Sequence, residues 1–153
     1  MPNLTAVETV DSSKLASLLD SAWAAAGAAT AAAAPRRLLD VFVQVNTSGE
    51  ESKHGCAPSE APALARHVHT ACPHLRFSGL MTIGQPDYSS RPENFTALRA
   101  CRAAVAAELG CDEATIELSM GMSGDYEAAI ATGSDSVRVG SSIFGARDYG
   151  TAT

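Results

Sequence analysis

The sequence predicts an α/β protein built on a parallel sheet. A strand-like segment is followed by a helix-like segment five times, and no hairpin signal lies between the strands. Residues 38–46 (LLDVFVQVN) form a nearly continuous β-branched and aromatic run, which is typical of a strand buried on both faces of a parallel sheet. The last two strands each end in a glycine–serine turn that opens a helix. We expect residues 1–153 to form a single domain, because this length supports one core.

The first unit combines a short strand with an amphipathic helix. Residues 4–10 (LTAVETV) are predicted as the strand, and Asp11 and Ser12 are expected to cap the helix. An alanine-rich tract, residues 24–34, follows, and the sequence leaves open whether it is helix or a surface connection. Spacing by three and four residues predicts the apolar helix face at Leu15, Leu18, Leu19 and Ala22.

The two middle units repeat this pattern. A helix is predicted over residues 59–71 and a strand over residues 77–83 (FSGLMTI). Pro92 is expected to open the next helix, where proline is tolerated, and Gly110 to end it. The inward residues of the first helix are predicted as Leu64, Ala65 and Val68, and those of the second as Phe95, Leu98, Cys101, Val105 and Leu109.

The segment from Thr115 to Arg147 contains the residues that indicate a ligand-binding site. Residues 116–119 and 136–139 alternate apolar and polar side chains, which predicts two strands. The turns that follow (SMGMSG and VGSS) point free backbone N–H groups and two helix dipoles at one spot, an arrangement that favours a phosphate. Arg138 has the inward parity and adds a cation there. The alternative is a pair of ordinary turns that need glycine for conformation and serine for capping.

Charge and composition narrow the function classes. A formal net charge of -6 argues against a nucleic-acid partner. The four cysteines lack the spacing of a metal site, which favours reduced thiols in a cytoplasmic protein, with a mitochondrial location left open. The sequence shows neither a signal peptide nor an apolar run long enough for a bilayer, so no membrane association is expected.

Four motifs together resemble the pyridoxal phosphate homeostasis proteins. They are QVNTSGEESKHG, FSGLMTIG, LSMGMSGDYEAAI and VRVGSSIFGAR, and they occur in order between about Val7 and Arg147. The resemblance implies a PLP-binding (β/α)8 TIM-type barrel related in fold to the N-terminal domain of alanine racemase. It also implies binding of pyridoxal 5′-phosphate (PLP) and a role in vitamin B6 homeostasis without catalytic turnover.

The resemblance assigns the ligand-binding residues as well. Ser123 and the Gly140–Ser141 turn are expected to hold the phosphate of PLP, and Arg138 is expected to face the pyridine nitrogen. An arginine there keeps the nitrogen unprotonated and weakens the ring as an electron sink. Asn46 and Met81 are expected at strand ends that line the same mouth.

The chain departs from the family pattern at its beginning. Neither of its two lysines, Lys14 and Lys53, matches the Schiff-base position, so PLP is expected to bind non-covalently or weakly. The first three βα units of the family are missing too, which predicts a truncated, partial barrel of about five units. Its first and last strands are expected to be open edges that self-associate or take up a complementing N-terminal segment. Met81 and Met120 are expected to be partly exposed there.

Three functions remain open. Beside PLP homeostasis, the chain is a candidate interaction fragment that completes a barrel with a separate N-terminal segment. The third is a PLP-dependent, racemase-like enzyme, which needs a lysine and an acid/base residue that the sequence does not show. For Arg138, the alternative to a ligand role is a structural pair with Glu117, which has the same inward parity on the preceding strand.

Overall fold

The computed structural model describes residues 3–28, 37–50, 54–84 and 92–145. Five strands form one parallel sheet in chain order: β1 (Ala6–Val10), β2 (Leu39–Gln44), β3 (Leu75–Met81), β4 (Glu117–Met122) and β5 (Ser136–Arg138). The helices are α1 (Ser13–Ala28), α2 (Ala61–Ala71), α3 (Pro92–Leu109), α4 (Tyr126–Ala131) and α5 (Ser141–Phe144). Short 3-10 turns cover Pro58–Glu60 and Glu113–Thr115.

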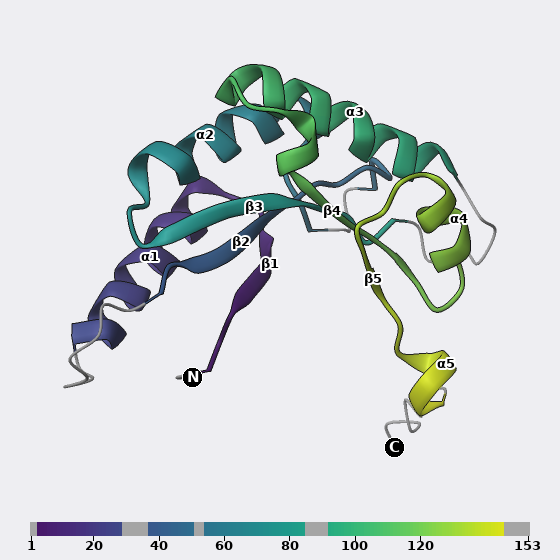
Figure 1. Cartoon of the computed structure of the whole chain (residues 1–153), viewed down its shortest axis with the longest axis horizontal. Coiled ribbons are helices and arrows are strands. Elements are labelled where there is room, and N and C mark those ends of the chain that lie inside the picture. The colour runs from purple at the N-terminus through teal and green to yellow at the C-terminus, as the bar shows by residue number, and fades with distance from the viewer. Residues whose placement is uncertain (1–2, 29–36, 51–53, 85–91, 146–153) are drawn as a thin grey trace.

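The sheet curls into a half-barrel. Figure 1 shows α2 and α3 along its convex side. Each strand pairs in parallel with its neighbour in sequence, so β1 and β5 are the edge strands of the described sheet. The predicted fold class, part of a TIM-type barrel with about five strand–helix units, is confirmed. None of the described helices is long and apolar enough to cross a bilayer.

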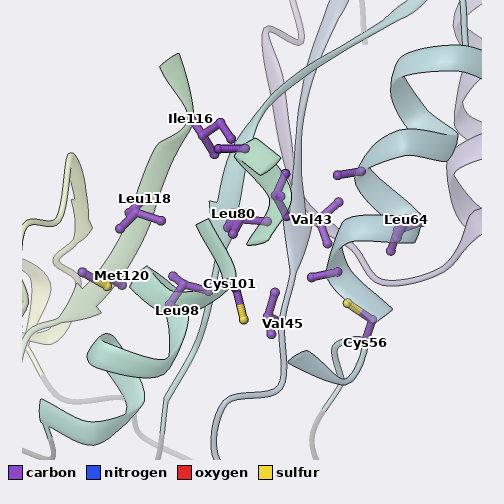
Figure 2. Close-up of a cluster of buried hydrophobic side chains, with 14 of the residues drawn as sticks. Val43, Val45, Cys56, Leu64, Leu80, Leu98, Cys101, Ile116, Leu118 and Met120 are labelled. Atoms are coloured by element: carbon purple, nitrogen blue, oxygen red, sulfur yellow. The ribbon is translucent and has the colours of Figure 1, made fainter. Parts of the chain in front are cut away.

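The main core lies between the sheet and the helices (Figure 2). Alternate residues of the strands face α2 and α3, because side chains of a strand point to opposite faces in turn. The predicted inward faces of α2 and α3 are confirmed, since their residues are buried, with Leu109 partly so. Complete burial of one such side chain contributes about 1.5–3 kcal/mol. The central members of this core are Val43, Val45, Leu80, Leu98, Cys101, Leu118 and Met120.

The predicted apolar face of α1 is wrong by about one residue. Leu15 and Leu18 are 38% and 60% exposed, whereas Ala16 and Trp23 are buried against the sheet with Leu19 partly packed beside them. The large indole fixes the rotation of the helix, because its Nε1 donates a hydrogen bond of 3.0 Å to the carbonyl oxygen of Arg37.

The expected exposure of Met81 and Met120 is also wrong, since they are 3% and 0% exposed. Met120 belongs to the core on the helix side of the sheet. Met81 has the opposite parity to the core residue Leu80, but it pairs in register with Gln44 and Ser119, which are themselves buried. The concave face of the curled sheet is therefore closed to solvent at this point.

Asp40 links β2 to β3 at the beginning of the sheet. Its carboxylate accepts hydrogen bonds from Arg76 Nη2 (2.8 Å) and Arg37 Nη2 (3.1 Å). Burial raises the pKa of Asp40, but hydrogen bonds and charge attraction from the two arginines outweigh it, so the pKa lies below its ordinary value. The stability that this group contributes is therefore present above the pKa of the unfolded chain and is lost as the pH falls through the lowered folded pKa.

Asp40→Asn is therefore expected to lower the free energy of unfolding by about 1 kcal/mol at neutral pH. The difference from the wild type is expected to shrink as the pH falls below about 4, because the wild-type carboxyl is then protonated as well. Urea unfolding at a series of pH values measures both effects. A difference that does not change with pH would show that the ion pairs contribute nothing.

Candidate ligand-binding site

The candidate site lies at the carboxyl ends of the strands. All five strands run parallel, so the turns that follow them meet at one edge of the sheet, where α/β proteins bind ligands. The structure joins Ser123 to Gly140 there, with Arg138 at the end of β5, Met81 at the end of β3 and Asn46 just after β2.

The turns after β4 and β5 meet at the Ser123 hydroxyl. Its Oγ accepts hydrogen bonds from the backbone N–H of Gly140 (3.0 Å) and of Ser142 (3.3 Å). Within the first of these turns, Asp125 Oδ1 accepts a hydrogen bond of 2.6 Å from the N–H of Met122. Ser141 lies between the two donors and is exposed. Two backbone donors thus converge on one oxygen, an arrangement that also favours the oxygen of an anion.

Arg138 is anchored over the concave face of the sheet. Its Nη1 donates to Ser119 Oγ and its Nη2 donates to the carbonyl oxygen of Thr82, both at 2.7 Å. Glu8 Oε2 lies 3.9 Å from Nη1. Burial lowers the pKa of Arg138, while the charges of Glu8 and Asp125 act in the opposite direction. An arginine retains its proton under such a shift, so the site holds a fixed cation.

The alternative considered for Arg138, a structural pair with Glu117, is wrong. Glu117 lies at the beginning of β4 and is exposed, whereas Arg138 is in register with Met122 at the end of that strand. The ion-pair partner is instead Glu8, on the opposite edge strand. The sequence contains one indication of this ion pair, a charged residue in the middle of the AVETV strand. The alternation of side chains along a strand does not reveal which strands face each other, so it could not identify the partner.

Asn46 shapes the loop after β2. Its Nδ2 donates to the carbonyl oxygen of Glu50 (2.8 Å), and its Oδ1 accepts from Ser48 Oγ (3.0 Å) and from the N–H of Gly49 (3.1 Å). Gln44 braces the same loop by donating to the carbonyl oxygen of His54 at 2.9 Å. The amide of Asn46 therefore organises the backbone at this strand end.

The donors of the site are of the kind that binds an anion, whereas metal ligands are not grouped there among the described residues. The described residues contain no group of three histidine, cysteine or carboxylate side chains that could hold a metal. The N–H groups of Gly140 and Ser142 already converge on one oxygen, that of Ser123, and Arg138 is a cation deeper in the fold. Lys14 is exposed on α1, and Lys53 lies outside the described residues.

Comparisons with known proteins show the family and the fold of this chain. The profile of the family described as alanine racemase, N-terminal domain, matches residues 2–148. A solved protein of unknown function from Bifidobacterium adolescentis is 39% identical, with a TM-score of 0.75 over 91% of this chain and 52% of that one. PipY of Synechococcus elongatus, solved with PLP bound, is 26% identical, with a TM-score of 0.71 over 92% of this chain and 60% of PipY. The family profile and the fold thus define a protein of the alanine racemase N-terminal domain class.

Curated relatives narrow the class. The chain is 49% identical over 156 residues to the pyridoxal phosphate homeostasis protein of Bos taurus and 48% identical over 152 residues to that of Homo sapiens. These matches cover 100% and 97% of this chain. The chain belongs to the pyridoxal phosphate homeostasis protein family, as its four motifs predict. It spans about half the length of these relatives, 55% and 53%.

Proposed function

We propose that this chain binds PLP and serves vitamin B6 homeostasis without catalytic turnover. The observation that carries the proposal is the convergence of two backbone N–H groups on Ser123 Oγ, beside an arginine anchored on the concave face of the sheet. The PLP bound in PipY and the names of the curated relatives support the same ligand.

In this proposal, different residues of the site contact the two ends of the ligand. Ser123, Gly140 and Ser141 hold the phosphate, with the N–H of Ser142 as a further donor. Asn46 and Met81 border the mouth from the ends of β2 and β3.

Arg138 faces the pyridine nitrogen at the other end. PLP supplies an aldehyde and an electron-withdrawing ring when it is bound. An arginine N–H donates to an unprotonated ring nitrogen and disfavours its protonation, so the ring withdraws electrons poorly. The site therefore binds the cofactor without promoting carbanion chemistry.

PLP is held non-covalently in this proposal. Lys14 is exposed in the first helix, and its side chain does not belong to the cluster formed by Ser123, Arg138 and Gly140. A racemase-like reaction needs a lysine and an acid/base residue at the ring, and the described site residues include neither.

PLP titration of the wild type and of Ser123→Ala tests the proposal. The variant is expected to bind PLP about 5- to 30-fold more weakly, because it loses one hydroxyl and the order that this hydroxyl gives to the second turn. Inorganic phosphate is expected to compete with PLP, and its own affinity is expected to fall by a similar factor. Equilibrium dialysis measures both ligands.

Ser21→Ala serves as the matched control, since the exposed Ser21 hydroxyl donates to the carbonyl oxygen of Ser17 within α1. Borohydride reduction of the PLP-saturated wild type, followed by peptide mapping, is expected to give only weak labelling. Stoichiometric labelling of Lys53 would contradict non-covalent binding and favour the enzyme. An anion located at Lys53 and His54 would contradict the phosphate assignment.

Association through the open edges is the second candidate function. Within the described sheet, β1 and β5 each pair on one side, and Ile143 and Phe144 of α5 are 67% and 86% exposed. Unpaired parallel edges and exposed apolar side chains favour another polypeptide, either a second copy or a complementing N-terminal segment.

The isolated chain is therefore expected to self-associate with increasing concentration in sedimentation velocity. Phe144→Ser is expected to weaken this association, because it removes an exposed aromatic side chain without changing a buried contact. A monodisperse monomer that melts in one sharp transition would show that the half-barrel is stable by itself.

A further inference from the structure

A chain of hydrogen bonds crosses the concave face of the sheet from β1 to β5. Ser119 Oγ donates to Glu8 Oε2 at 2.7 Å, and Arg138 Nη1 donates to Ser119 Oγ at 2.7 Å. Ser119 is fully buried, and the Glu8 and Arg138 side chains are about one-third exposed. A short, partly desolvated chain of this kind favours one arrangement of its members.

The direction of these hydrogen bonds depends on Glu8. A serine hydroxyl has a single proton, and the carboxylate of Glu8 can only accept it. The hydroxyl oxygen of Ser119 therefore presents its lone pairs to Arg138, which can only donate. Without an acceptor at Glu8, the hydroxyl is free to turn its proton elsewhere, and the arginine loses a fixed partner.

Two anchored nitrogens determine the orientation of the guanidinium plane. Nη1 is fixed through Ser119 and Glu8, and Nη2 is fixed by the carbonyl oxygen of Thr82. A guanidinium is planar and carries five N–H donors in a rigid fork, so two fixed bonds also determine where the other donors point. The charge of Asp125 acts on Arg138 as well, but no hydrogen bond joins the two side chains among those described.

We propose that Glu8 is a positioning residue, which directs an Arg138 donor at the ring nitrogen of a phosphorylated pyridine and so selects ligands that have this nitrogen. The inference rests on the proposed PLP site. It adds that a residue on the opposite edge strand sets the preference between a pyridine ring and a benzene ring of the same shape. Phosphate binding at Ser123 and Gly140 does not depend on Glu8, because neither residue touches this hydrogen-bond chain.

The test compares PLP with its benzene analogue, which has the same substituents but no ring nitrogen. The wild type is expected to prefer PLP by about tenfold, the effect of one hydrogen bond to a charged donor. Glu8→Ala is expected to lose this preference while its affinity for the analogue stays within about twofold. Glu8→Gln is expected to recover most of the preference, because its amide oxygen still accepts the Ser119 proton.

A spectroscopic measurement separates positioning from a merely structural role. In the wild type, the ¹⁵N chemical shift of labelled PLP is expected to show a hydrogen-bonded, unprotonated ring nitrogen. In Glu8→Ala it is expected to move toward the value of free PLP at the same pH. Ser119→Ala removes the intermediate hydroxyl and is expected to act in the same direction, so it replaces Glu8→Ala if that variant does not fold. Glu117→Gln, exposed on the same sheet, is the control.

Each other outcome is decisive. A wild type that binds neither PLP nor the analogue overturns the proposed function, and the role of Glu8 with it. A wild type that binds both equally leaves PLP binding intact and overturns the positioning role alone. An equal loss of affinity for PLP and for the analogue in Glu8→Ala would show that Glu8 has a structural role only. An unchanged preference and ¹⁵N shift in both Glu8→Ala and Ser119→Ala would also overturn the proposal.

Discussion

Arg138→Ala is expected to weaken PLP binding by about 10- to 100-fold, the range for loss of a charged hydrogen-bond donor. Binding of inorganic phosphate is expected to change less, because the proposed phosphate end of the site consists of Ser123 and the turn after β5. The same substitution removes the partner of Glu8 and the donor to Thr82, so a lower melting temperature is expected as well. Parallel titrations with PLP and inorganic phosphate measure the difference.

Arg138→Lys separates geometry from charge. A lysine keeps the positive charge but has no planar fork, so it cannot hold the positions of Ser119 and Thr82 while also donating to a ligand. It is expected to lose most of the PLP affinity with a smaller loss of stability. Arg99→Ala, exposed on α3, is the control. If both Arg138 variants bound PLP as tightly as the wild type, Arg138 would not be a PLP-binding residue.

Gly79→Ala is expected to destabilise the fold by about 3 kcal/mol or more, at the upper end of the effect of overpacking. A Cβ at this position would lie 2.1 Å from the carbonyl oxygen of Glu117 and 2.9 Å from Cε1 of Phe42. Gly79 and Glu117 face each other in the pairing of β3 with β4, and the Phe42 ring lies against the glycine. Because the obstacle is backbone, the two strands have to separate, and ligand binding after β4 and β5 is expected to weaken too.

Urea unfolding measures this loss. Ser78→Ala on the same strand is the control, because it changes the neighbouring residue without adding a group to the contact with β4. The control is expected to unfold within about 0.5 kcal/mol of the wild type, as is usual for a substitution away from packed features. A Gly79→Ala variant as stable as the control would show that β3 and β4 are not packed this closely.

The sequence by itself determined the elements and their order. The buried LLDVFVQVN strand, the inward stripes of α2 and α3 and the start of α3 at Pro92 depend on local spacing, and they occur as predicted. The two Gly–Ser turns were predicted to meet, because parallel strands bring their carboxyl ends to one edge. The four motifs likewise identified the family, which depends on sequence alone.

Only the tertiary structure decided what faces what across the curled sheet. Parity placed both Glu117 and Arg138 on the concave face, but the register of β4 and β5 put them at opposite ends and left Glu117 exposed. The rotation of α1 depended on where the Trp23 indole finds its carbonyl partner. The burial of Met81 depended on neighbouring strands, and the contact between Glu8 and Ser119 joins residues 111 positions apart. These features follow from how far the sheet curls, which is the sum of small twists between strands and leaves no periodic signal in the chain.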